Sequence, residues 1–231
     1  MSPLRKTSLV AGVLYLLTFV SIPTLILYVP VHGANYIIGA GPDTSAIIGA
    51  ILEIIVALAG IGTAVVLFPV LKKQNEAAAL GLVASRVLEA STIFVGVAFI
   101  LSIVTLRQTG AGAGALVTSH ALATLYDRIF LQGQSFMPAV NDLLLGFLLY
   151  KSRLVPRGLS LIGIVGAPVL LAAYLAVMFG LIGLHAAPAT FAALPVALFE
   201  FSLGVYLIVK GFKPSPITAG MAATSDVIPA S

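Results

Sequence analysis

The 231-residue chain contains no cysteine, and only 9% of its residues are Asp, Glu, Lys or Arg. Without cysteine, the sequence excludes a disulfide framework, a thiolate metal site and a cysteine-ligated iron–sulfur cluster. Ordinary soluble domains carry about 25% charged residues. A water-soluble fold of this size could not hide a composition that is 60% hydrophobic, because its surface is too large for its volume. The scarcity of charge therefore indicates an integral membrane protein whose partner is the lipid bilayer.

The sequence also has no tryptophan, so an aromatic belt at the membrane interfaces would rely on tyrosines such as Tyr28, Tyr36, Tyr126 and Tyr150. It has no P-loop, no GxGxxG signature, no HExxH and no GxSxG element. No histidine falls within an apolar stretch, which disfavours a bis-histidine haem site and an intramembrane Ser–His protease. We therefore expect no cofactor and favour a protein that is not an enzyme.

Six apolar stretches fit, or nearly fit, the roughly 20 residues that a spanning helix needs. The fourth is short and carries Gln134, Asn141 and Asp142, so five spans remain the main alternative. Pro23 is expected to kink the first span. The sequence predicts an all-α membrane bundle of about six transmembrane helices in one domain, residues 1–213, with spans near 8–30, 45–71, 78–106, 134–150, 158–184 and 191–209.

Two segments outside these spans have predictions of their own. Residues 119–130 are expected to form a short amphipathic helix that lies on the outer membrane surface. Residues 214–231 are rich in Ala, Ser, Thr and Pro without periodicity, and they are expected to form a flexible tail. Pro42 and Asp43 offer a start for the second span, with Asp43 as a candidate cap.

The basic residues give the predicted orientation. Nine of the twelve Lys and Arg residues lie on the same side of a six-span topology, and only Arg107 and Arg128 lie on the other. Because basic residues collect in cytoplasmic loops, both termini are predicted to be cytoplasmic. The net charge of +4 is thus a topology signal, and we expect no nucleic-acid partner.

A few ionisable side chains lie within the spans, where each costs about 2.5–3.5 kcal/mol to insert. At 1.5 Å per residue, four of them share a layer in the cytoplasmic half, while Glu53 lies nearer the outer end of its span and is not assumed to join them. Glu53, Glu89 and Glu200 each lie on a helix face of small residues, which places them inside the bundle. The candidate polar layer comprises Arg86, Glu89, Asp142, Glu200, Asn141 and Glu53.

One Arg faces three acids in this layer, so at least one acid lacks a cationic partner and is expected to be protonated. Three roles stay open for the layer. It is a structural ion-pair cluster that fixes helix register, a group that handles protons or cations, or a catalytic or ligand-binding site.

The three histidines, His32, His120 and His185, are predicted to lie in three different outer segments. Three imidazoles are enough for a zinc or copper site. However, no pair has the spacing of a metal motif, so we favour exposed interfacial histidines and no metal. Asp127 and Arg128 are expected to form a solvated pair.

Three segments resemble a known family. They are Phe68–Glu76 (FPVLKKQNE), Ser85–Glu89 (SRVLE) and Tyr150–Gly163 (YKSRLVPRGLSLIG), and they resemble the family called domain of unknown function 4386. The resemblance covers roughly residues 5–212, with Arg86, Glu89, Pro156 and Arg157 at matched positions. It implies a small multi-span protein of the bacterial inner membrane and assigns no activity.

The leading hypothesis for function is an ion- or proton-coupled carrier of a small solute. The alternative is an accessory or scaffolding subunit with a membrane-protein partner, and the third option is an intramembrane enzyme that modifies lipids. A carrier needs a cavity that reaches the charged layer, whereas a lipid enzyme needs a portal from the bilayer to the acids.

Overall fold

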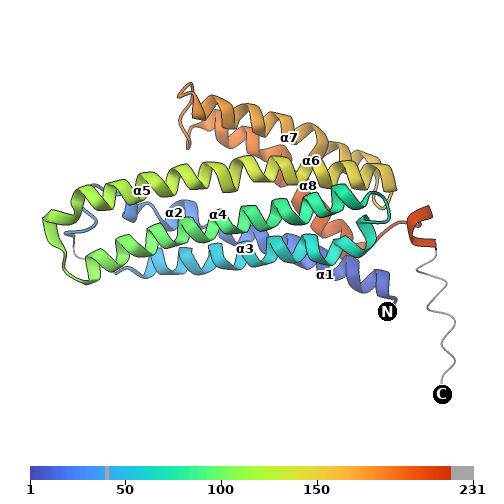
Figure 1. Cartoon of the computed structure of the whole chain (residues 1–231), viewed down its shortest axis with the longest axis horizontal. Coiled ribbons are helices and arrows are strands. Elements are labelled where there is room, and N and C mark those ends of the chain that lie inside the picture. Colours follow the sequence, from blue (N-terminus) through green and yellow to red (C-terminus); the bar gives the residue numbers. More distant parts are fainter. Residues whose placement is uncertain (40–41, 220–231) are drawn as a thin grey trace, which may run out of the picture.

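The computed structural model of the chain describes residues 1–39 and 42–219. The described part is all-α, as predicted, and Figure 1 shows its long helices lying side by side along one axis. Its α-helices are α1 (Pro3–Leu17), α2 (Thr24–Leu27), α3 (Thr44–Leu71), α4 (Glu76–Gln108), α5 (Leu116–Leu131), α6 (Met137–Ser152), α7 (Arg157–Met178) and α8 (Ala187–Val209).

Five helical stretches in the described residues are long and apolar enough to cross a membrane: Pro3–Leu27, Thr44–Leu71, Glu76–Gln108, Arg157–Met178 and Ala187–Val209. The predicted span at 134–150 is not among them, because α6 has only 16 residues. The first stretch is broken where Pro23 was expected to kink it: α1 stops at Leu17, a 3-10 turn η1 (Thr18–Ser21) follows, and Pro23 precedes α2.

The outward faces of these helices are apolar. On α3, Ile51, Leu58 and Val65 are each more than half exposed and recur every seven residues. The opposite stripe of small residues on the same helix is buried, as its spacing predicted. An apolar exterior around a polar interior fits lipid contact, so the chain is a multi-span membrane protein.

The prediction of a surface helix at 119–130 is wrong. Helix α5 continues through a π-helical turn, η4 (Gln132–Phe136), directly into α6, and the N–H of Met137 donates to the carbonyl of Gln132. The three elements have 16, 5 and 16 residues, which corresponds to about 55 Å of helix. The polar residues that suggested a surface helix are instead the outer half of a long helix packed on α4.

The long helices of the bundle differ in length. With 33 residues, α4 is about 50 Å long, whereas α7 and α8, with 22 and 23 residues, are close to the roughly 30 Å of a hydrocarbon core. In Figure 1, α4 and α5 extend well beyond the loop that joins α7 to α8. The largest apolar core cluster contains Tyr15, Leu145, Phe199 and Leu203 and lies near the opposite, N-terminal end.

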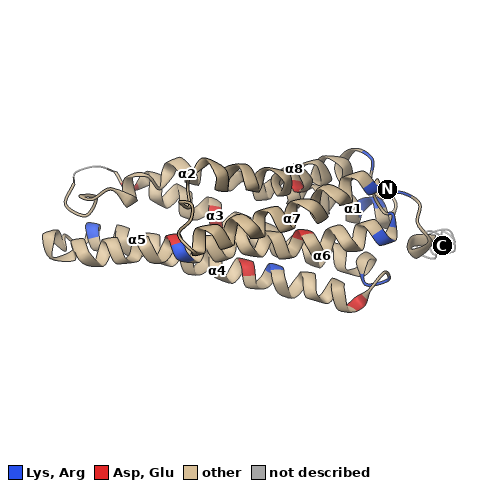
Figure 2. Ribbon diagram, turned by 90° about the horizontal axis from the view of Figure 1, so that it is seen from above, with Lys and Arg blue, Asp and Glu red and all other residues tan. Residues whose placement is uncertain are grey.

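Basic side chains gather at this N-terminal end of the bundle (Figure 2). The guanidinium of Arg5 donates to the carbonyl oxygens of Leu207 and Ile208, so a cation caps the last turn of α8, where the helix dipole favours it. The basic residues beside the helix ends here are Arg5, Lys6, Lys72, Lys73, Lys151, Arg153, Arg157, Lys210 and Lys213.

The start of the predicted tail packs on this end. Ser215 and Thr218 are buried beside a short 3-10 turn, η5 (Pro216–Thr218), and the N–H of Lys213 donates to the carbonyl of Leu154 at 2.8 Å. The rest of the predicted tail, residues 220–231, lies outside the described residues.

At the far end, Asp43 links the loop before α3 to the end of α4. Its carboxylate accepts hydrogen bonds from the hydroxyl of Tyr36 at 2.6 Å and the guanidinium of Arg107 at 3.0 Å. Asp43 is the N-cap residue of α3, as expected, but its side chain makes no capping hydrogen bond to the helix. Burial and the hydrogen bond to Asp43 raise the pKa of Tyr36 to about 12. Tyr36 is therefore buried beside the Arg107 guanidinium, 4.5 Å from its ring centre, and does not belong to an interfacial belt.

The contact between α1 and α8 depends on glycine. A Cβ added at Gly12 would lie 2.7 Å from the carbonyl oxygen of Gly204, which is backbone and cannot rotate away. A Cβ added at Gly81 would meet nothing closer than 3.8 Å. Close approach of this kind is typical of packed membrane helices.

We predict opposite signs for two matched substitutions. Gly81→Ala should raise the free energy of unfolding by about 0.5–1 kcal/mol, because alanine suits a helix interior better than glycine. Gly12→Ala should lower it by about 1–3 kcal/mol through overpacking. Unfolding by titration with a denaturing detergent measures both, and equal effects at the two positions would contradict the close contact.

Candidate functional site

The polar layer is built on one face of α4. Arg86 and Glu89 are three residues apart, so their side chains meet, and Nη1 of Arg86 lies 2.9 Å from Oε2 of Glu89. The other amino group of Arg86 pairs with Glu200 on α8. The side chains of Arg86, Glu89 and Glu200 are only 3%, 9% and 12% exposed. The structure thus brings together three residues that the sequence placed in one layer.

Helix α6 supplies the next two predicted residues. The side-chain amide of Asn141 donates to Oε2 of Glu89 at 2.8 Å, so this carboxylate oxygen accepts from two elements. Asp142 is fully buried, and both of its carboxyl oxygens lack a hydrogen-bond partner among the described residues. It lies close enough to Glu200, Arg86 and Glu89 to interact with them electrostatically. Asp142 is therefore the acid that the sequence expected to have no cationic partner.

Tyr15 on α1 completes this layer and was missed in the sequence. The centre of its ring is 5.7 Å from the guanidinium carbon of Arg86, within the range of a cation–π contact. Its side chain is fully buried, and its hydroxyl has no partner in the described structure. The only signal in the sequence for the burial of Tyr15 was its position on the same helix face as Ser8 and Gly12.

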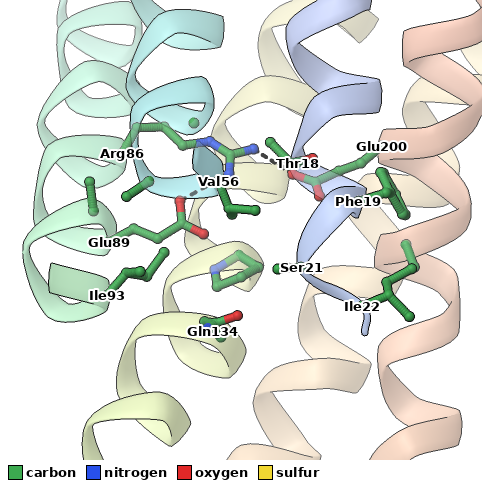
Figure 3. A pocket seen from close by; sticks show the side chains of 15 residues that line it. Thr18, Phe19, Ser21, Ile22, Val56, Arg86, Glu89, Ile93, Gln134 and Glu200 are labelled. Atoms are coloured by element: carbon green, nitrogen blue, oxygen red, sulfur yellow. Dashed lines mark hydrogen bonds and ion pairs between the residues drawn. The ribbon is translucent and has the colours of Figure 1, made fainter. Parts of the chain in front are cut away.

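A cavity of about 200 Å³ opens beside the ion pairs (Figure 3). Figure 3 shows Arg86, Glu89 and Glu200 along one side of this space, with Gln134 on another. The remaining wall is mostly apolar and small, and two irregular turns contribute to it, η1 of the first span and η4 before α6. The other lining residues are Thr18, Phe19, Ser21, Ile22, Val56, Ala57, Gly60, Ala90, Ile93, Pro138 and Ala197.

Glu53 does not join this layer. It is 1% exposed, and its carboxylate accepts hydrogen bonds from the hydroxyls of Tyr126 at 2.8 Å and Tyr28 at 3.3 Å and from the amide of Gln134 at 2.9 Å. This second cluster is closer to the N-terminal end of α3. Gln134 connects the two, because it binds Glu53 and also lines the cavity beside Arg86.

Tyr28 and Tyr126, two of the tyrosines on which an interfacial belt would rely, are also turned into the bundle. Both rings are buried, at 3% and 6% exposure, and they meet edge to face with centres 5.3 Å apart. Sequence reasoning did not pair them with Glu53, because they come from segments nearly a hundred residues apart. The one signal in the sequence was that Glu53 is a buried acid without a nearby cation. Such an acid requires hydrogen-bond donors from other segments.

The three histidines are all exposed, and the structure does not bring them together as one set. His32 binds Asp127, with Nε2 3.0 Å from Oδ1, so Asp127 pairs with His32, contrary to the expected pair with Arg128. His120 lies 3.1 Å from the carbonyl oxygen of Ala34, and His185 lines an outer cavity that His32 also lines. Within residues 1–39 and 42–219, no three His, Asp or Glu side chains are placed to hold a metal ion.

Comparison with known proteins places this chain in a family. Searches of curated proteins and of solved structures gave no match. A family model described as "Domain of unknown function (DUF4386)" matches residues 10–211, which include both polar clusters and every helix that lines the cavity. The chain therefore belongs to the DUF4386 family.

Proposed function

We propose that this protein is a proton-coupled carrier of small cations in the inner membrane of a bacterium. The observation that carries the proposal is the 200 Å³ cavity that borders the Arg86, Glu89 and Glu200 side chains in the interior of the bundle. The alternative of a purely structural ion-pair cluster does not require an adjoining cavity. A third role, as a lipid-modifying enzyme, would require a portal that leads from the bilayer to the acids.

The charge of the layer supports a cationic solute. Arg86 compensates one of the two glutamates that bind it, so these three groups together carry one negative charge. Asp142 adds a second negative charge when it is ionised, and an unpaired carboxylate is expensive inside a membrane. A proton on Asp142 and a cation in the cavity each neutralise part of the same excess negative charge, so their binding is expected to be competitive. Competition of this kind couples the movement of the cation to the opposite movement of a proton across the membrane.

The size of the cavity limits the solute. An engineered cavity of about 150 Å³ holds one benzene molecule, so the 200 Å³ space suits an organic cation of about ten non-hydrogen atoms or fewer. The small residues of the wall, such as Gly60 and Ala197, leave this room. Glu200 is the most exposed of the charged groups and is the expected contact for the cation.

Helix irregularity supports movement around the site. A 3-10 stretch in a longer helix often marks a hinge, and π turns occur often at functional sites. Both kinds line the cavity, η1 through Thr18 and Ser21, and η4 through Gln134. Interrupted spans next to a binding site are also a feature of carriers.

We further propose a six-span topology in which residues 1–213 form one domain and α6 with η4 is the fourth span. The basic end of the bundle would face the cytoplasm, since Lys and Arg collect on that side. Both termini would then be cytoplasmic. Accessibility labelling of single cysteines, introduced into this cysteine-free chain at the α3–α4 and α7–α8 loops, tests the orientation directly.

Proteoliposomes with an imposed pH gradient test the proposed transport. Addition of methylammonium, guanidinium or tetramethylammonium as probes is expected to release protons in vesicles that contain the protein. Glu200→Gln and Asp142→Asn should each lose most of this release, whereas Glu76→Gln, at the start of α4, should retain it. No proton movement above protein-free vesicles with any probe would overturn the proposal. Purification with a stoichiometric partner chain, in that case, would favour the accessory subunit.

Infrared spectroscopy tests the proton on Asp142. The wild-type protein is expected to show the C=O stretch of a protonated carboxyl, and this band should disappear in Asp142→Asn. A wild-type spectrum without this band in neutral buffer would contradict the proposed competition between proton and cation.

A further inference from the structure

A second cavity, of about 500 Å³, lies in the half of the bundle opposite the basic N-terminal end (Figure 2). Tyr28, Tyr126 and Phe130 supply aromatic rings to its wall, Asp127 supplies a carboxylate, and His32 and His185 supply imidazoles. These side chains come from the turn after α2, from η2 (Pro30–His32), from α5 and from the loop before α8. The cavity shares no lining residue with the one beside Arg86.

The aromatic side chains form a connected group. The ring of Tyr126 lies 5.3 Å from that of Tyr28, 5.9 Å from that of Phe130 and 5.9 Å from the imidazole of His32, measured between ring centres. A cation is attracted to the face of an aromatic ring within about 6 Å of its centre. Several rings around one space are the arrangement that recognises ammonium groups.

The negative charge around the cavity is larger than the positive charge on its wall. Asp127 lines it directly, and Glu53 lies behind Tyr28 and Tyr126, whose hydroxyls both donate to its carboxylate. Donation to a carboxylate increases the electron density of a phenol ring, which favours a cation at its face. On the wall, His32 contacts Asp127 directly at 3.0 Å, and its imidazolium form would offset this carboxylate.

We propose that this outer cavity binds the ammonium group of an organic cation between the Tyr28 and Tyr126 rings and the Asp127 carboxylate. The exposed apolar side chains of Leu25 and Val29 at the same cavity would contact the carbon groups of that ligand. The site goes beyond the proposed carrier function, because binding here needs neither the Arg86 cavity nor transport. Free organic cations and the headgroups of choline lipids both present this ammonium chemistry.

Calorimetric titration of the purified protein in a maltoside detergent tests the proposal. Choline is the probe, and 3,3-dimethylbutanol is the neutral control of the same shape. Choline is expected to bind, whereas the neutral alcohol is expected not to bind. Equal binding of the two would show an unselective apolar cavity and overturn the proposal, and so would the absence of choline binding.

Three variants locate the site. Tyr126→Leu and Asp127→Asn should each weaken choline binding about tenfold, the effect of losing one desolvated cation contact. Tyr206→Leu, at the opposite end of the bundle, should have no effect. Asp127 is partly exposed, so Asp127→Asn is expected to fold even if Tyr126→Leu does not. Unchanged binding in Asp127→Asn would overturn the assignment of the site.

The Arg86 cavity is distinguished by Glu200→Gln, which should leave choline binding at the outer cavity unchanged. If Glu200→Gln abolishes it while Asp127→Asn does not, choline binds at the inner cavity and the outer site is refuted. Nanodiscs with and without phosphatidylcholine then identify the source of the ligand. Competition between this lipid and free choline indicates a headgroup, and independence indicates a free cation.

The pH dependence gives a second readout. Nδ1 of His32 lies 2.9 Å from the carbonyl oxygen of Tyr28, and Nε2 lies 3.0 Å from Asp127, so both nitrogens face acceptors as in an imidazolium. The hydrogen bond to Asp127 raises the pKa of His32 above its ordinary value. The other titratable groups around this imidazole are Tyr126 and, on the cavity wall, Tyr28 and His185.

As pH rises through the raised pKa of His32, the imidazolium loses its charge and Asp127 is no longer compensated. Choline affinity is therefore expected to increase with pH across the range in which His32 titrates, and His32→Gln should remove most of this dependence. Replacement of His120, which does not line the cavity, should leave the pH dependence of choline affinity unchanged. An affinity that falls with rising pH would contradict the role of the His32–Asp127 pair.

Discussion

Replacing Arg86 by methionine is expected to lower the free energy of unfolding by about 3–5 kcal/mol, the usual effect of removing one partner from a buried ion pair. The guanidinium binds Glu89 at 2.9 Å and also pairs with Glu200, so its loss leaves two acids in the bundle without a cation. Asn141 remains as a hydrogen-bond donor to Glu89, but it carries no charge. Unfolding by detergent titration measures the loss.

A triple variant separates stability from function. When all members of a buried charge cluster are replaced by apolar residues of similar volume, stability often recovers. Arg86→Met combined with Glu89→Leu and Glu200→Leu is therefore expected to be more stable than Arg86→Met alone and to be inactive in the proton-release assay. If the triple variant is as unstable as the single one, the ion pairs are not the cause. If it is stable and fully active, the cluster has no role in transport.

Glu53→Leu is the second substitution with a large expected effect. It removes the acceptor for three donors at once, the hydroxyls of Tyr28 and Tyr126 and the amide of Gln134. An unsatisfied buried polar group costs about 1–3 kcal/mol, so we expect a loss of about 3 kcal/mol or more in the free energy of unfolding. Glu53→Gln retains an acceptor oxygen and should lose much less.

The control for Glu53 is Glu76, a glutamate in the exposed first turn of α4. Glu76→Leu should change the free energy of unfolding by less than about 1 kcal/mol, the size of a helix-dipole contribution. Equal effects of Glu53→Leu and Glu76→Leu would contradict the hydrogen-bond cluster. Because Tyr28 and Tyr126 also line the outer cavity, Glu53→Leu is expected to weaken choline binding there as well.

The charged layer could be predicted because depth along a helix is a simple function of residue number. The positions of Arg86, Glu89, Asp142 and Glu200 relative to the helix ends put them at similar depth, and the structure brings all four within electrostatic contact. Helix faces followed from the spacing of small residues, as on α3 and α4. Both inferences use only local geometry.

Other parts of the site depend on rotation and long-range contact, which no local pattern contains. The partners of Glu53 come from the turn after α2, from α5 and from η4, and Gln134 lies within the π-helical turn itself. The same turn makes α5 continue into α6, whereas periodicity alone suggested a separate surface helix. Tyrosines in outer segments fit an aromatic belt equally well until their neighbours are known.

By itself, the sequence determined that this chain is an all-α membrane protein and which ionisable residues lie at one depth. Composition, helix rise and the cost of burying charge are enough for those conclusions. Only the tertiary structure decided that the layer borders a cavity, that Glu53 forms a second cluster with Tyr28 and Tyr126, and that His32 binds Asp127. These features depend on how helices far apart in the sequence are rotated against one another, and that rotation is fixed by packing of the whole bundle.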